Sequence, residues 1–218
     1  MPAILSRFEN ERILFLPVLR SRYFYLGLLA LILGNELNFV SQTYLYDSIS
    51  EGKTLPELSD MILDNLPVFN VSLLYDLFSA VTVIIVIIYI IHRKDYRSIP
   101  FFLVMIGILE LLRGIFIVLT PLGNPPLFDG TNSIFNGFSK YELGVYPSGH
   151  TGCAFLYFLM VKDKWYRWII FFCLVIVIVS LFFAHAHYSI DILSGLIFAY
   201  AINSFGNKHL KMFILDSK

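Results

Sequence analysis

The chain has 218 residues, of which 57% are hydrophobic and 15% are charged, and its formal net charge is zero. Soluble domains are about 45–50% apolar, so this composition excludes an ordinary water-soluble domain and predicts an integral membrane protein. A balanced charge gives no indication of nucleic acid as a partner.

The first segment, residues 1–22, mixes arginines and glutamates with short apolar runs. It lacks the uninterrupted apolar core and small-residue cleavage site of a secretory signal. We therefore expect an amphipathic helix that lies on the membrane surface.

Six apolar segments follow, and each approaches the length of about 20 residues that a helix needs to cross a bilayer. The fourth and the sixth are short or carry polar residues at one end, as expected where that end faces a watery cavity. The sequence thus predicts an all-α polytopic membrane protein of one domain, with a six-span core over 23–205 and a tail over 206–218. The predicted spans are 23–39, 71–91, 99–120, 148–161, 168–184 and 188–205.

Lysine and arginine predict the orientation of these spans. Four lie in residues 1–22 and three in each of 92–98, 162–167 and the tail, whereas the opposite loops hold only Lys53 and Lys140. Basic residues favour the cytoplasmic side, so both termini should be cytoplasmic. The loops 41–70 and 121–147 should then lie on the non-cytoplasmic side.

Ionisable residues inside the spans are costly to bury unless they meet partners or water. They all fall toward the predicted non-cytoplasmic side, which indicates a polar site at that end of the bundle. Glu36 and Asp76 are equally compatible with an interfacial or structural role. The residues are Glu36, Asp76, Glu110, Arg113, His150, His187 and Asp191.

Two histidine motifs provide the clearest indication of chemistry, and the second reads His185-Ala186-His187-Tyr188-Ser189-Ile190-Asp191. Residues four apart share a face of a helix, so Asp191 can accept the Nδ1 proton of His187 and leave Nε2 basic. This spacing is typical of an oriented nucleophile or base.

The first motif reads Pro147-Ser148-Gly149-His150-Thr151 and should open a helix, whose unpaired N–H groups and dipole form an anion site. Gly149 would let a phosphate approach closely, and Ser148 and Thr151 could donate hydrogen bonds to it. Two imidazoles at one phosphate can serve as attacking group and leaving-group acid. Structural histidines or metal ligands are the alternatives; zinc is disfavoured because no third ligand has suitable spacing.

These motifs resemble those of the type 2 phosphatidic acid phosphatase superfamily and, within it, the sphingomyelin synthase branch, over about residues 109–200. The branch reads Ser-Gly-His-Thr and His-Tyr-Thr-x-Asp. The resemblance implies that His187 attacks phosphorus, that Asp191 orients it and that His150 protonates the departing alcohol. Arg113 lies in a segment that is similar to an arginine segment of the synthases.

The chain departs from the general phosphatases of that superfamily, which carry Lys-x6-Arg-Pro and Ser-Arg-x5-His-x3-Asp. It lacks the first motif, and Leu181 follows Ser180 in place of the arginine. A phosphomonoester gains from several cations, so a site with Arg113 as its evident buried cation is better matched to a diester. Further candidate site residues are Tyr188 for substrate binding, and Glu110, Glu142 and His185 as possible members, with Glu142 alternatively an exposed loop residue.

The sequence therefore predicts a lipid phosphotransferase or phospholipase C-type enzyme that works on the non-cytoplasmic face without metal or cofactor. The phospho-headgroup of a membrane phospholipid would pass through a phosphohistidine to a ceramide-like alcohol or to water. The alternatives are a phosphatase acting on phosphatidate or an isoprenyl diphosphate, and an inactive lipid-binding scaffold. A transporter would need polar residues at every depth, which these spans do not have.

Overall fold

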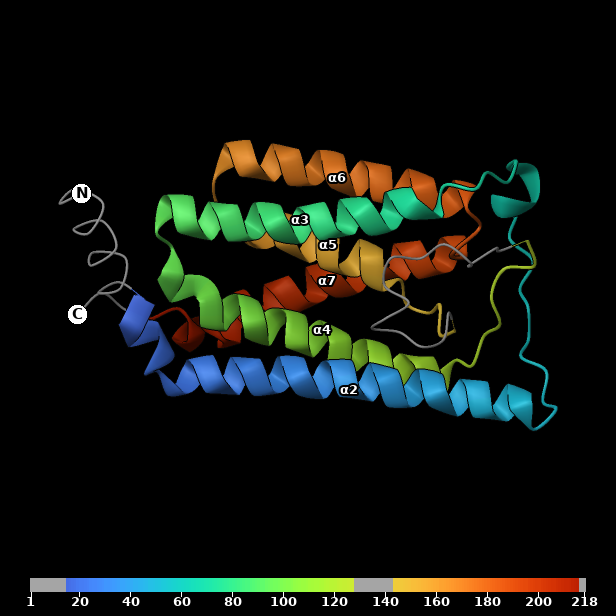
Figure 1. Ribbon diagram of the computed structural model, residues 1–218, viewed down its shortest axis with the longest axis horizontal. Helices are drawn as coiled ribbons and strands as arrows, with labels where there is room; N and C mark the ends of the chain where they lie inside the picture. The colour runs from blue at the N-terminus through green and yellow to red at the C-terminus, as the bar shows by residue number, and fades with distance from the viewer. Residues whose placement is uncertain (1–14, 128–142, 216–218) are drawn as a thin grey trace, which may run out of the picture.

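The computed structural model describes residues 15–127 and 143–215, and this part of the chain is all-helical, without strands (Figure 1). Residues 15–19 of the predicted surface helix form a helical turn and Arg22 already begins the first long helix, while residues 1–14 and Glu142 lie outside the described residues. The main helices are α2 (Arg22–Ser50), α3 (Ser72–Arg93), α4 (Ile99–Leu119), α5 (Gly149–Met160), α6 (Lys164–Phe183) and α7 (Ser189–His209). Short 3-10 turns are η1 (Leu63–Asn65), η2 (Tyr96–Ser98) and η4 (Lys211–Phe213).

Every predicted apolar segment is a helix, but the helices differ in length. Five of those in the described ranges are long and apolar enough to cross a membrane. The remaining one, α5, has 12 residues and extends only about 18 Å at 1.5 Å per residue. The expectation of six full spans therefore holds for five helices, and the fourth predicted span is a short helix inside the bundle.

Two helices continue at least four residues beyond their predicted ends. The first span was expected to end at residue 39, but α2 continues to Ser50, because residues 40–50 contain neither glycine nor proline. The chain leaves the helix near Gly52, whose φ of +89° is readily adopted by glycine. The predicted tail begins inside α7, which reaches His209 before the η4 turn.

Successive helices run in opposite directions, so the loops alternate between two ends of the bundle (Figure 1). The loops before α3, after α4, before α5 and between α6 and α7 share one end. The start of α2 and the end of α7 share the other end. This arrangement agrees with termini on one side of the membrane, and the cytoplasmic assignment of that side remains a prediction.

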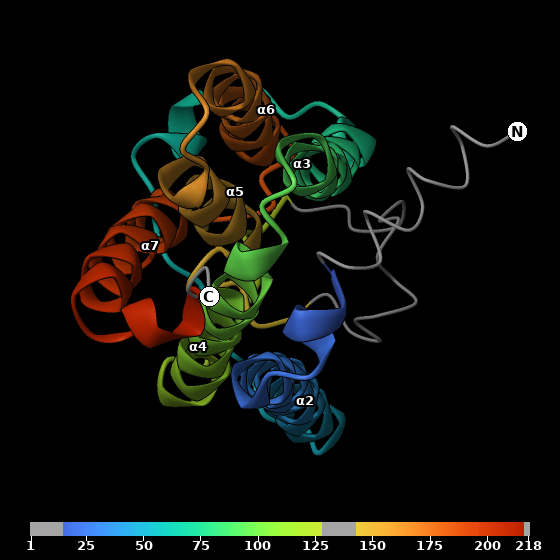
Figure 2. The same cartoon turned by 90° about the vertical axis from the view of Figure 1, so that its left-hand side faces the viewer.

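Glycines allow close helix packing in two places. α2 lies along α4, where a Cβ added to Gly34 would be 2.8 Å from the Gly107 carbonyl oxygen. α5 lies among α3, α4, α6 and α7, and a Cβ added to Gly195 of α7 would be 2.7 Å from the Ser148 carbonyl oxygen (Figure 2). Small residues at helix contacts are typical of membrane bundles. The second contact holds the two histidine motifs side by side.

The outer faces of the bundle are apolar. Large apolar side chains of α2, α3 and α6 are about half exposed, which water would disfavour and lipid would not. Examples are Leu29, Ile32, Ile84, Ile87, Ile88, Phe172 and Val179. Together with the helix lengths, these faces are those of a multi-pass membrane protein.

Candidate active site

Ser148 caps α5, at the point where the motif predicts that a helix opens. The Ser148 hydroxyl accepts a hydrogen bond from the Thr151 N–H at 3.4 Å and donates one to Thr151 Oγ1 at 3.2 Å. Both residues are almost fully buried, at 1% and 0% exposure. Their hydroxyls therefore bond to each other and to the helix start in this structure. Their predicted contact with phosphate remains a prediction.

Asp191 both caps α7 and holds His187. Its Oδ2 atom accepts a hydrogen bond from the Tyr188 N–H at 2.8 Å and lies 3.4 Å from His187 Nδ1. His187 precedes the first helical residue, Ser189, so the expected pair forms through a helix cap and not through two positions on one helical face. The pairing leaves Nε2 as the nitrogen that can act on a substrate.

His187 lies in the loop between α6 and α7 and is 6% exposed. Burial lowers the pKa of His187, and this outweighs the upward influence of Asp191; His150 and Arg113 lower the pKa further. The ring is therefore neutral at neutral pH. A neutral imidazole is the form that can attack as a nucleophile.

The structure brings the two motifs together. The Ser148 N–H donates a hydrogen bond to the Asp191 carbonyl oxygen at 3.1 Å, so the starts of α5 and α7 are directly joined. The ring centroids of His150 and His187 lie 6.2 Å apart, with the planes inclined at 66°. Reacting atoms need about 3–3.5 Å, and a proton donor needs about 2.6–3.2 Å. The two rings are therefore close neighbours, and their joint action on one phosphoryl group remains a prediction.

Asp76 is the site residue that sequence reasoning left undecided. Its Oδ1 atom lies 3.1 Å from His150 Nε2, and the carboxylate is fully buried. The adjacent Tyr75 ring meets the His150 ring edge-on at 5.1 Å between centroids. In the sequence, Asp76 stood out as a carboxylate within an apolar span. Only the packing of α3 against α5 shows that its partner is His150.

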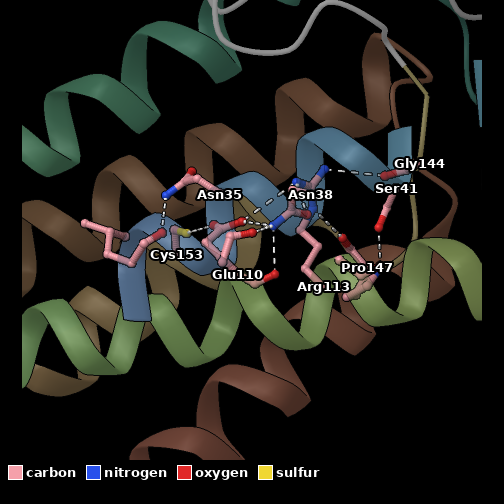
Figure 3. A network of polar contacts seen from close by, with 11 residues as sticks. Asn35, Asn38, Ser41, Glu110, Arg113, Gly144, Pro147 and Cys153 are labelled. Carbon is pink, nitrogen blue, oxygen red and sulfur yellow. Dashed lines mark hydrogen bonds and ion pairs between the residues drawn. The ribbon is translucent and has the colours of Figure 1, made fainter. Parts of the chain in front are cut away.

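Arg113 lies beside the first motif, with its guanidinium bonded to the protein (Figure 3). Nε donates to the Pro147 carbonyl at 3.3 Å, Nη2 to the Gly144 carbonyl at 3.4 Å and Nη1 to Asn38 Oδ1 at 3.1 Å. These bonds hold the segment that enters α5. The structure thus shows Arg113 in a structural role. Its phosphate binding remains a prediction.

Gly149 lies directly against this arginine. A Cβ at Gly149 would be 3.0 Å from Arg113 Nε and 3.2 Å from Cδ. Sequence analysis assigned Gly149 to the close approach of a phosphate. The structure shows that a larger residue at this position would also crowd the Arg113 side chain.

Glu110 links three helices next to Arg113 (Figure 3). Its carboxylate accepts hydrogen bonds from Asn38 Nδ2 at 2.9 Å and from Cys153 Sγ at 3.2 Å, and it lies 3.9 Å from Arg113 Nη1. The network joins α2, α4 and α5 and places a counter-charge beside the arginine. Glu110 thus helps to hold Arg113 and α5 in place next to the first motif.

Two other candidates contact loops in the structure. The Tyr188 hydroxyl accepts a hydrogen bond from the Leu58 N–H at 3.1 Å and donates to the Asn124 carbonyl at 3.3 Å, and the residue is 1% exposed. His185 has a φ of +50° and bonds through Nε2 to the Leu66 carbonyl at 3.3 Å. Both side chains hold the first loop against the second motif.

Comparison with known proteins bears on the same region. Residues 147–208 match the family model described as PAP2 superfamily C-terminal. The match shows that this part of the chain is similar to the PAP2 superfamily. It covers α5, α6 and nearly all of α7, and with them His150, His187 and Asp191. Members of the PAP2 superfamily are phosphoester hydrolases or transferases, which suggests a lipid phosphatase or phosphotransferase type of activity. No curated protein and no solved structure matches the chain.

Proposed function

We propose that the chain is a membrane enzyme that cleaves the phosphodiester of a phospholipid and transfers the headgroup phosphate through His187. The observation that carries the proposal is the pair of imidazoles 6.2 Å apart, each bonded to a buried carboxylate. The PAP2 match over both motifs supports phosphoester chemistry at this pair.

In the first step, the Nε2 lone pair of His187 attacks phosphorus, and a P–N bond forms. The P–O bond to diacylglycerol breaks as His150 donates a proton to the departing oxygen. Asp191 accepts the Nδ1 hydrogen bond and stabilises the positive charge that develops on His187. The products of this step are diacylglycerol and a phosphohistidine that carries the headgroup.

In the second step, His150 accepts a proton from an acceptor hydroxyl, whose oxygen attacks phosphorus and breaks the P–N bond. The acceptor is a ceramide-like alcohol, in line with the resemblance to the sphingomyelin synthase branch, or water. Asp76 holds the His150 ring in place through both proton transfers. The covalent intermediate allows donor and acceptor lipids to use the site in turn.

A diester substrate is favoured by the apolar surroundings of one position. Leu181, which stands where the general phosphatases carry arginine, is fully buried in α6 and packs with Ala184, Ala186 and Ile192. A diester brings one negative charge and a monoester nearly two, so the diester depends less on additional cations. Arg113 supplies a positive charge beside the first motif. We place the reaction on the non-cytoplasmic face, following the distribution of lysine and arginine.

The test uses the purified full chain in liposomes that contain headgroup-labelled phosphatidylcholine or phosphatidylethanolamine, with and without ceramide. Diacylglycerol with a ceramide phospholipid would mean transfer, and diacylglycerol with free phosphoalcohol would mean hydrolysis. His187→Ala should abolish turnover, whereas His209→Ala, an exposed histidine at the other end of α7, should retain it.

Two outcomes would contradict the proposal. Turnover by the His187→Ala protein at the wild-type rate would exclude the covalent mechanism. Release of inorganic phosphate from phosphatidate or an isoprenyl diphosphate, without cleavage of any diester, would select the alternative of a lipid phosphate phosphatase.

A further inference from the structure

The loop between α2 and α3 is fastened to the loop that carries His187. Its residues 58–69 contact the 183–189 segment at four points. The Leu58 N–H bonds to the Tyr188 hydroxyl at 3.1 Å, and the Phe69 N–H bonds to the Phe183 carbonyl at 2.8 Å. His185 bonds to the Leu66 carbonyl, and Asp60 bonds to Ser189. We call residues 58–69 the strap.

Asp60 makes the most specific of these contacts. Its Oδ2 accepts the Ser189 N–H at 2.5 Å, and its Oδ1 accepts the Ser189 hydroxyl at 2.8 Å. Oδ1 also accepts the N–H groups of Ile62 at 2.9 Å and Leu63 at 3.3 Å. The carboxylate therefore makes hydrogen bonds both within the strap and to the start of α7.

Ser189 is the first residue of α7, and N–H groups in the first turn of a helix have no partner within the helix. The Tyr188 side chain gives no cap hydrogen bond, and its hydroxyl bonds instead to loop atoms of Leu58 and Asn124. Asp60, 129 residues away in the chain, supplies a partner and places a negative charge at the positive end of the helix. The strap thus completes the cap that Asp191 begins.

This cap lies beside the reacting groups. Ser189 is two residues from His187 on one side and two residues from Asp191 on the other. The His187–Asp191 contact of 3.4 Å is long for a hydrogen bond, so its alignment depends on the backbone that carries both residues. Asp60 fixes that backbone midway between them.

We propose that Asp60 is a positioning residue, which clamps Ser189 and thereby holds His187 in line for attack on phosphorus. This inference rests on the proposed function. A displacement of about 1 Å in a reacting group can cost a hundredfold in rate. The loss expected from releasing the clamp is therefore in kcat, while KM stays close to its wild-type value.

The experiment compares Asp60→Ala, Asp60→Asn and Ser189→Ala with a matched control, Asp64→Ala, which removes an exposed carboxylate from the same strap. Asp60→Ala should lower kcat for labelled phospholipid about tenfold or more, with KM within about twofold. Asp60→Asn should recover part of the loss, because its amide oxygen can accept the Ser189 N–H. Ser189→Ala should lose less than Asp60→Ala, because the backbone bond remains.

Hydrogen–deuterium exchange of residues 185–191 provides a readout that does not need turnover. Exchange should rise in Asp60→Ala and not in Asp64→Ala. Unchanged exchange in Asp60→Ala would overturn the clamp, and faster exchange with wild-type kcat would overturn its positioning role. If the wild-type protein turns over no phosphoester, the proposed function fails while the exchange comparison still decides whether the clamp exists.

Discussion

The imidazole of His150 is bonded through Nε2 to the carboxylate of Asp76, at 3.1 Å, in the interior of the helix bundle. Asp76 belongs to α3, whereas the acid that holds His187 belongs to the same motif as that histidine. Each histidine is therefore held by a carboxylate, His150 through Nε2 and His187 through Nδ1, and the two carboxylates differ in origin. One pair is encoded locally, and the other depends on helix packing.

Asp76→Asn should lower kcat about a hundredfold, because general acid–base catalysis contributes about 10²–10⁴ and depends on the orientation of the ring. KM should change little, because Asp76 contacts His150 and not the lipid in our proposal. Kinetics with labelled phospholipid would measure both constants. Ser79→Ala is the control, since the Ser79 hydroxyl is buried on α3 without a hydrogen-bond partner among the described residues. An Asp76→Asn enzyme with wild-type kcat would show that the pair has no catalytic role.

The acid limb of kcat/KM should report the protonation of His187. Burial lowers the pKa of His187, so the neutral ring should persist below the ordinary histidine value of about 6.5. Activity should be lost as the pH falls through this lowered pKa. Because Asp191 raises the pKa of His187, Asp191→Asn should move the limb to lower pH as well as reduce the rate.

The same shift affects stability. A histidine whose pKa is lowered by folding binds its proton more readily in the unfolded chain, so the folded protein should lose stability as the pH falls below about 6.5. Thermal unfolding in detergent, measured across this range, should show a smaller pH dependence in His187→Ala. A pH–rate limb that lies above the ordinary histidine value would contradict both expectations.

Replacing Arg113 separates its two roles. Lysine keeps the charge but lacks the planar set of donors that reaches Pro147, Gly144 and Asn38. If the main task is to hold the entry to α5, Arg113→Lys and Arg113→Ala should both lose about tenfold or more in kcat. If the main task is to supply charge to the phosphate, Arg113→Lys should keep most of the activity. Asn38→Ala removes one Arg113 acceptor and the Nδ2 donor to Glu110, but it leaves the Pro147 and Gly144 contacts in place, so its effect should be smaller.

Gly195→Ala should separate the two motifs. The new methyl group would lie 2.7 Å from the Ser148 carbonyl oxygen and 3.2 Å from the Gly152 nitrogen, both of them backbone atoms. Overpacking of this kind costs about 1–3 kcal/mol, and both Tm and kcat should fall. Gly123→Ala is the matched control, because its nearest contacts are at 3.5 Å. Equal Tm and kcat in the two variants would show that the contact tolerates a methyl group.

Local patterns were sufficient to predict the helices. Apolar runs located all six, since a stretch without polar groups must satisfy its backbone internally in lipid. The predicted length of the first span was too short. Hydropathy falls near residue 40, but the residues that follow still form helix as far as Ser50. The helix start after Ser148 and the pair of His187 with Asp191 were also predicted, because both depend on residues close together in the chain.

The sequence by itself was therefore enough to predict a multi-pass membrane protein, to locate its helices and to single out His150 and His187 as candidate site residues. The tertiary structure alone decided that Asp76 serves His150, that Arg113 bonds to Pro147 and that Asp60 caps α7. These contacts join residues between 34 and 129 positions apart. Their formation depends on how separate helices and loops pack against one another, and no local pattern specifies that packing.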